Sequence, residues 1–157
     1  ADNGVKFSSI NVANDWSQAF GGMTNNSDNI SFDGDGNAHV PADGLWTFTI
    51  DFTSDTMTLT EGQIYGIGPC FGDGNNWDVS KAKAGTVNAD GTASIVTDLA
   101  GDLRIFAPCA FDWWQHEFKP TAEGGIVYRD GGELEAFNVE AGKTVTFDFN
   151  AGTVTIK

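Results

Sequence analysis

The feature that most constrains the fold of this chain is an internal repeat. Residues 5–60 resemble residues 103–157 at an offset of 97–98 residues. Trp16–Phe20 (WSQAF) matches Trp114–Phe118 (WQHEF), and Thr56–Thr60 (TMTLT) matches Thr153–Lys157 (TVTIK). Self-similarity at a fixed offset is the signature of a repeated structural unit, so the repeat predicts two related pieces of structure.

The offset also sets the domain boundaries. A unit as long as the offset occupies residues 61–157, whereas residues 1–60 correspond only to the second half of another unit. Because half a unit cannot close its own core, we expect residues 1–60 to pack on the complete module, to pair with another chain, or to rebuild a sheet by edge addition. The chain begins at Ala1 rather than Met, which indicates a processed or recombinant fragment.

Apolar residues alternate with polar ones over short runs, and no window has a sustained helical period. In Gly44–Phe52 the side chains of Trp46, Phe48, Ile50 and Phe52 share one face, and a short turn leads to Thr56–Thr60, which predicts a β-hairpin with Trp46 in the core. Short strands separated by turns predict an all-β fold, an immunoglobulin-like antiparallel β-sandwich. In the complete module we expect strands at Gln63–Ile67, Ala93–Thr97, Leu103–Ala107, Ile126–Tyr128, Ala136–Val139, Lys143–Phe149 and Thr153–Ile156.

The charge of the chain excludes several classes of partner. The formal net charge is −14, which repels nucleic-acid backbones. No apolar run approaches the length of a membrane span. We therefore expect a soluble protein that is secreted or displayed at a cell surface, with no nucleic-acid partner.

The two cysteines, Cys70 and Cys109, allow one intramolecular disulfide. Each follows a proline at the end of an apolar run, so a bridge is plausible if the two runs form neighbouring strands. Two buried thiols fit the sequence equally well. The lack of a CxxC motif or of a Cys/His cluster disfavours structural zinc.

One segment resembles a calcium loop. Asp33, Asp35 and Asn37 place oxygen ligands at alternate positions, but Ala38 stands where such a loop needs glycine, and no Glu occupies the twelfth position. The Asp-Gly pairs favour a hairpin turn instead. We therefore expect no cofactor, with calcium at these three residues as the weaker alternative.

The order of several motifs resembles a known family. The segments are Asn14–Trp16 followed by Gly21-Gly22, the strand Gly44–Asp51 with its Thr-rich partner, and the opening Ile64–Gly68 followed by Asn76–Asp78. Nearly the whole chain is similar to modules of SusE/SusF-like outer-membrane glycan-binding proteins. The resemblance implies β-sandwich modules of surface lipoproteins from Gram-negative gut bacteria, which bind starch or another polysaccharide on aromatic platforms without catalysis.

Tryptophans are the first candidates for ligand contact, because sugar rings stack their C–H faces on flat aromatic surfaces. Trp114 matches Trp16 in the repeat and is expected to pack, whereas Trp113 has no counterpart and is expected to be exposed and to contact the ligand. Trp77 lies in a Gly/Asn-rich loop and either binds ligand or covers one end of the sandwich. Trp16 is either a shared structural anchor or a second, weaker platform.

Polar residues follow the tryptophan pair. Cations are scarce in this acidic chain, so those beside the pair suggest hydrogen bonds to sugar hydroxyls, with a solvated surface as the alternative. The candidates are Gln115, Lys119, Arg129 and Asp130, together with His116.

Catalysis has little support in the sequence. Only His39 and His116 could serve as imidazole bases, and no G-x-S-x-G motif is present. The sequence therefore predicts non-catalytic binding of a neutral polysaccharide or oligosaccharide, either a starch-like α-glucan or a plant β-glucan or hemicellulose. The alternatives are a structural or adhesion module that binds a protein partner, and a binding appendage of a glycoside hydrolase. The expected location is extracellular, at the outer-membrane surface, with neighbouring modules of a larger surface protein or enzyme as further partners.

Overall fold

The chain folds into two compact units, which we call the N-terminal unit (Ala1–Glu61) and the C-terminal unit (Gly62–Lys157). The computed structural model describes residues 4–9, 12, 15–72, 77–108, 112–129 and 134–157. Within these residues the protein consists of β-strands and three short 3₁₀ helices, as the alternating pattern predicted. None of these helices is long and apolar enough to cross a membrane.

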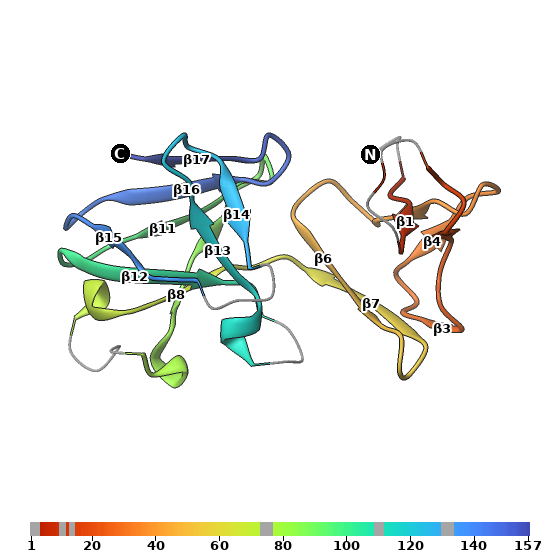
Figure 1. The fold of residues 1–157 in the computed structure, drawn as a ribbon, viewed down its shortest axis with the longest axis horizontal. Helices are drawn as coiled ribbons and strands as arrows, with labels where there is room; N and C mark the ends of the chain where they lie inside the picture. Colours follow the sequence, from red (N-terminus) through yellow and green to blue (C-terminus); the bar gives the residue numbers. More distant parts are fainter. Residues whose placement is uncertain (1–3, 10–11, 13–14, 73–76, 109–111, 130–133) are drawn as a thin grey trace. The chain divides into compact units, whose positions relative to one another are not determined.

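The C-terminal unit contains two antiparallel sheets (Figure 1). The first has the order β10-β11-β16-β17, with bounds Thr86–Val87, Ala93–Val96, Thr144–Asp148 and Thr153–Ile156. The second has the order β14-β13-β12-β8-β9, with bounds Ile126–Tyr128, Glu117–Pro120, Gly101–Phe106, Tyr65–Ile67 and Lys83–Ala84. Strand β15 (Phe137–Val139) also pairs with β12, and the 3₁₀ helices span Pro69–Phe71, Val79–Lys81 and Trp113–Gln115.

The two sheets pack face to face and confirm the predicted β-sandwich. The fully buried side chains come from both sheets, since alternate residues of each inner strand point inward. Gly66 of β8 marks their close approach: a Cβ there would lie 2.5 Å from Cδ1 of Ile95 in the opposite sheet. The buried apolar residues of this unit are Ile64, Ile67, Cys70, Ala93, Ile95, Leu103, Ile105, Phe106, Val139, Val145, Phe147 and Val154.

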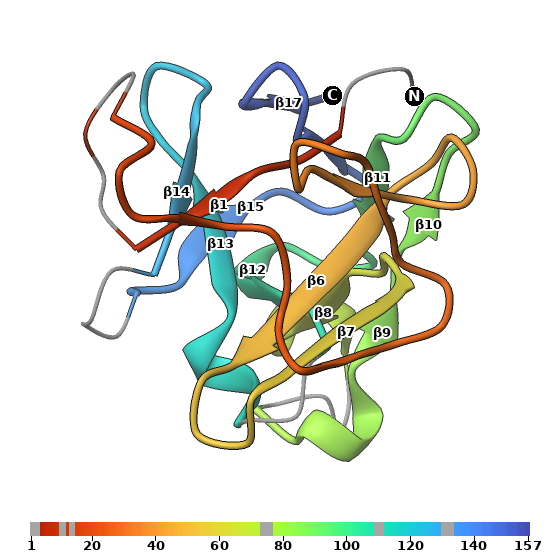
Figure 2. The same cartoon turned by 90° about the vertical axis from the view of Figure 1, so that its right-hand side faces the viewer.

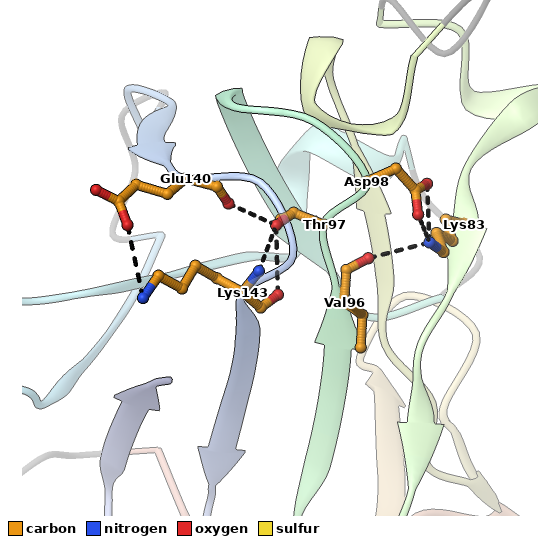
Figure 3. A network of polar contacts seen from close by, with 6 residues as sticks. All are labelled: Lys83, Val96, Thr97, Asp98, Glu140 and Lys143. Atoms are coloured by element: carbon orange, nitrogen blue, oxygen red, sulfur yellow. Dashed lines mark hydrogen bonds and ion pairs between the residues drawn. The ribbon is translucent and has the colours of Figure 1, made fainter.

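A buried hydroxyl ties the end of β11 to the turn that precedes β16 (Figure 3). Thr97 is 1% exposed; its Oγ1 donates to the carbonyl oxygen of Glu140 at 2.7 Å and accepts from the backbone N–H of Lys143 at 3.1 Å. Nearby, Lys83 donates to the carboxylate of Asp98 at 2.8 and 2.9 Å. The turn is therefore held by side chains as well as by the sheet.

Replacing Thr97 by valine should lower the free energy of unfolding of the C-terminal unit by about 1–3 kcal/mol, because the two hydrogen bonds that its buried hydroxyl makes to Glu140 and Lys143 are lost. Urea unfolding monitored on this unit measures the change. The matched control is Thr155→Val on the exposed side of β17, which should stay within about 0.5 kcal/mol of the parent. Equal effects of the two substitutions would contradict a structural role for the Thr97 hydroxyl.

The N-terminal unit contains three small sheets. The six-residue strands β6 (Trp46–Asp51) and β7 (Thr56–Glu61) form a twisted antiparallel hairpin, which is labelled in Figures 1 and 2 and agrees with the predicted hairpin. Strand β3 (Asn25–Asn26) pairs with β7 in parallel, a departure from the antiparallel pattern. The remaining pairs are β1 (Phe7–Ser8) with β2 (Ala19–Phe20), and β4 (Ser31–Phe32) with β5 (Ala38–His39).

The core of the N-terminal unit is small. Four of its described residues are buried, namely Ile30, Ala38, Met57 and Leu59, and partly buried aromatic and aliphatic side chains pack around them. Trp46 is one of these, and its indole N–H donates to the carbonyl of Ala42 at 2.9 Å. Phe52, expected on the same face, is 68% exposed because β6 ends at Asp51 and the chain turns there.

The repeat seen in the sequence is preserved in the strand pairing. The two strands that open each repeated segment pair in the same register, and so do the two strands of each closing hairpin. Phe7↔Phe20 matches Ile105↔Phe118 at an offset of 98, and Ile50↔Met57 matches Phe147↔Val154 at an offset of 97.

The segment considered as a calcium loop forms the turn of the β4–β5 hairpin. The carboxylate of Asp33 accepts hydrogen bonds from the backbone N–H of Asp35 at 3.0 Å and of Asn37 at 2.8 Å, and from the Asn37 side-chain amide at 2.7 Å. These bonds, led by those of Asn37, hold the pKa of Asp33 well below its usual value. The carboxylate oxygens are thus engaged in closing the turn.

Cys70 is a free thiol in the structure, fully buried beside β12. Burial raises its pKa to about 11, so it stays protonated and unreactive at neutral pH. Its predicted partner, Cys109, lies outside the described residues.

Candidate functional site

The candidate site lies on the outer face of the sheet that contains β12. Leu103 and Ile105 are fully buried in the sandwich, so the alternate residues Arg104 and Phe106 point outward. Tyr65 of β8 and Glu117 of β13 stand opposite Phe106 on its two sides. The register thus gathers two aromatic rings, a guanidinium and a carboxylate on one patch.

Arg104 and Glu117 form an ion pair beneath this patch. The guanidinium contacts both carboxylate oxygens, Nε with Oε1 and Nη2 with Oε2, the latter at 2.6 Å. The Glu117 side chain is 1% exposed and that of Arg104 13%. A two-point contact in a water-poor environment fixes the plane of the guanidinium.

Two tryptophans from separate segments of the chain pack against this guanidinium. The ring centroids of Trp113 and Trp77 lie 4.9 and 5.9 Å from Cζ of Arg104, within cation–π range. Trp113 also packs on Phe106 at 5.4 Å, and Phe106 stacks on Tyr65 at 5.7 Å. The result is a continuous aromatic cluster around one fixed cation.

The backbone of Trp77 is strained. Its φ of +64° lies in the left-handed region, which a bulky residue rarely adopts. The next residue, Asp78, caps the 3₁₀ helix Val79–Lys81 by accepting from the backbone N–H of Ser80 at 3.1 Å. Trp77 keeps 39% of its surface exposed. Strain of this kind collects where structure serves function, so we include Trp77 in the candidate site.

The orientations predicted for the adjacent tryptophans are reversed in the structure. Trp114 is 37% exposed, while Trp113 is half-buried against Phe106 and Arg104. The prediction assumed an extended segment, but the two residues lie in a 3₁₀ helix. One side chain still points inward and one outward, and contact with the Phe106 ring selects Trp113 as the inner one.

The exposed Trp114 packs against a second cation, Arg129. The Cζ atom of Arg129 lies 4.2 Å from the Trp114 ring centroid, and its Nη1 donates to the Trp114 carbonyl oxygen. The hydroxyl of Tyr128, next in the chain, contacts Nδ1 of His116 at 3.1 Å. Partial burial, with a smaller effect of Arg129, lowers the pKa of His116, which favours a neutral ring at pH 7.

Comparison with known proteins places the chain in a family. A family model described as SusF/SusE starch specific CBMs, that is, carbohydrate-binding modules, matches residues 63–155. The chain belongs to this family. It is also similar to the crystal structure of SusF from Bacteroides thetaiotaomicron, with a TM-score of 0.74 and 26% identity over 91% of this chain. The chain covers 35% of that SusF chain, and the comparison with curated proteins finds no match.

Membership of the SusF/SusE family confirms the resemblance noted in the sequence. The C-terminal unit is a non-catalytic carbohydrate-binding module, as predicted. Family members are surface-associated proteins of Bacteroidetes.

The structure brings together some of the predicted site residues and not others. Trp77 and Trp113 meet at Arg104, and Trp114 pairs with Arg129. Gln115 is exposed beside Trp114 in the same 3₁₀ helix. Asp130 lies outside the described residues.

Lys119, on β13, donates instead to the carbonyl of Glu135 at 3.4 Å. In the N-terminal unit, Trp16 is 58% exposed, so it does not serve as a buried anchor. Among the described residues no group of three or more His, Cys, Asp or Glu side chains is placed to hold a metal ion.

Arg104, Glu117 and Tyr65 were missed by the sequence analysis. An arginine between two core residues of a strand, in a chain with only eight cations, was the available signal for Arg104. In the repeat Arg104 matches Lys6, whose Nζ donates to the carbonyl of Asp35 at 2.8 Å. Glu117 matches Ala19, so the repeat carries no hint of the ion pair.

Proposed function

We propose that the C-terminal unit binds a starch-like α-glucan by stacking sugar rings on Trp77 and Trp113, with Trp114 and Arg129 extending the contact surface. The observation that carries this proposal is the convergence of two tryptophans from separate segments of the chain on the guanidinium of Arg104, which a buried carboxylate holds in place. The packing of this cluster does not explain why the Trp77 ring is left exposed.

The physical case for stacking rests on preorganisation. Tryptophan offers a large flat surface with few rotatable bonds, and the apolar faces of sugar rings match it. Contact with Arg104 already restricts the two rings, so binding a glycan would immobilise few additional rotamers. Hydrogen bonds to sugar hydroxyls from nearby polar groups, such as Gln115, would fix the orientation of the chain.

The choice of an α-glucan over a plant β-glucan or hemicellulose is supported by the description of the matched family as starch-specific. The neutral character of the ligand follows from charge, because a formal net charge of −14 would repel an acidic polysaccharide. A single shallow site of this kind binds weakly, and several such sites on one polymer gain avidity. We propose that this binding takes place at the outer-membrane surface.

The proposal is tested by affinity electrophoresis and titration calorimetry of the full chain. The ligands are amylopectin and maltoheptaose, with xyloglucan, a mixed-linkage β-glucan and xylan as alternatives. We expect retardation by amylopectin only. We expect Trp77→Ala to weaken maltoheptaose binding at least about tenfold, which is about 1.4 kcal/mol, because the exposed ring of the platform is removed.

The matched control is Phe52→Ala, which removes an exposed aromatic ring of the N-terminal unit and should leave the affinity unchanged. Trp77→Gly is a second variant: it also removes the ring but relieves the left-handed backbone, so a loss of binding there cannot be attributed to misfolding. Retardation by a β-glucan or a xylan alone would reject the α-glucan. Unchanged affinity in both Trp77 variants would reject this platform.

A further inference from the structure

A second aromatic platform adjoins the first and is built on a different cation. The first platform consists of Trp77 and Trp113 on Arg104, and the second of Trp114 on Arg129. Arg129 holds Trp114 at two points: Cζ of its guanidinium lies 4.2 Å from the ring centroid, and Nη1 donates to the Trp114 carbonyl oxygen. One residue therefore fixes both the ring and the backbone of Trp114.

Arg129 is itself anchored by the sheet. It directly follows β14, and its backbone N–H donates to the carbonyl oxygen of Glu117 on β13 at 3.1 Å. The neighbouring Tyr128 contacts Nδ1 of His116 through its hydroxyl at 3.1 Å. The segment that leads into β13 is thus held to the end of β14 by two consecutive side chains. Figure 1 shows the 3₁₀ helix at the start of β13, with β14 beside that strand.

Glu117 is the common reference point of the two platforms. Its carboxylate binds Arg104, the cation of the first platform, and its backbone carbonyl accepts from Arg129, the cation of the second. Consecutive residues of a 3₁₀ helix project about 120° apart, so the adjacent Trp113 and Trp114 cannot lie under the same sugar ring. A glycan chain must therefore extend beyond the first platform to reach Trp114.

The N-terminal unit offers an internal comparison. Trp16, the counterpart of Trp114, is 58% exposed, against 37% for Trp114. The segment aligned with Arg129, residues 31–33, reads Ser-Phe-Asp and contains no cation. A planar guanidinium stacks on aromatic faces. The lower exposure of Trp114 agrees with Arg129 as the residue that holds its ring.

We propose that Arg129 is a positioning residue, which orients Trp114 as a second stacking subsite that only α-glucan chains longer than the first platform occupy. This inference rests on the function proposed above. The guanidinium occupies one face of the indole, so a sugar stacks on the other. Because a neutral glycan offers no charge to bind, the cation acts through the ring.

The test compares two ligand lengths by titration calorimetry of the full chain. We expect Arg129→Ala to weaken maltoheptaose binding at least about fivefold and to change maltotriose binding less than about twofold, because only the longer chain reaches Trp114. Trp114→Ala should show the same dependence on length, and so should Arg129→Lys, which keeps the charge but not the planar contact. The control Lys143→Ala, which removes a cation before β16, should leave both affinities unchanged.

A double-mutant cycle separates positioning from direct contact with the sugar. If Arg129 acts through Trp114, the variant that lacks both side chains binds maltoheptaose as tightly as Trp114→Ala alone. Additive losses would overturn the positioning role, since Arg129 would then bind the sugar by itself. Equal losses for both ligand lengths in Arg129→Ala, or unchanged maltoheptaose binding in Trp114→Ala, would overturn the second subsite.

These outcomes differ from a failure of the proposed function. If the parent chain binds neither amylopectin nor maltoheptaose, the α-glucan and the second subsite are rejected together. If the parent binds both and Trp77→Ala weakens maltotriose as well as maltoheptaose, the first platform stands, and the length dependence of the Trp114 and Arg129 variants alone decides the second. Trp114→Ala removes the ring without altering the sheet, so it remains decisive even if Arg129→Ala perturbs the fold.

Discussion

The substitution Arg104→Ala should lower the free energy of unfolding of the C-terminal unit by about 3–5 kcal/mol. The reason is the burial of its partner: the Glu117 side chain is 1% exposed and would remain as an uncompensated carboxylate. Trp113 and Trp77 would also lose the cation against which they pack. Chemical denaturation, followed through amide signals of this unit, measures the change.

The control for this prediction is the double variant Arg104→Met with Glu117→Leu. Removing both charges leaves no buried carboxylate, so most of the lost stability should return. The two residues act as positioning residues for the rings, so the double variant should fold and yet bind maltoheptaose more weakly. A cost of about 1 kcal/mol or less for Arg104→Ala would mean that Glu117 reaches water and that the pair behaves as a surface ion pair.

Much of the fold could be predicted because it depends on local patterns. The alternation in Gly44–Phe52 indicated a strand, and the turn after it indicated the hairpin that β6 and β7 form. The repeat predicted two related pieces of structure, and the shared registers of the two units agree with it. Trp77 and Trp113 were each predicted as ligand contacts, but their common packing on Arg104 was not predicted.

The features that were missed depend on strand pairing and on local backbone conformation. The ion pair of Arg104 with Glu117 joins residues that become neighbours only once β12 and β13 pair. Nothing in the sequence shows that the adjacent tryptophans lie in a 3₁₀ helix rather than an extended segment.

A comparison of two phenylalanines on equivalent strands measures how far the N-terminal core is open. Phe147→Ala on β16 should cost the C-terminal unit about 3–5 kcal/mol, because the ring is fully buried between two sheets and leaves a cavity. Phe48→Ala on β6 should cost the N-terminal unit roughly half as much, because that ring is half-buried and packs on Phe7 from one side. Denaturation of each variant, followed through amide signals of the affected unit, gives both values.

The two losses in free energy of unfolding can be compared directly, since residue type and strand position are matched. Phe48 is half-buried, so its ring has less contact to lose than that of the fully buried Phe147. If Phe48→Ala proves as costly as Phe147→Ala, the face of β6 is already covered and the N-terminal unit is a closed fold in its own right.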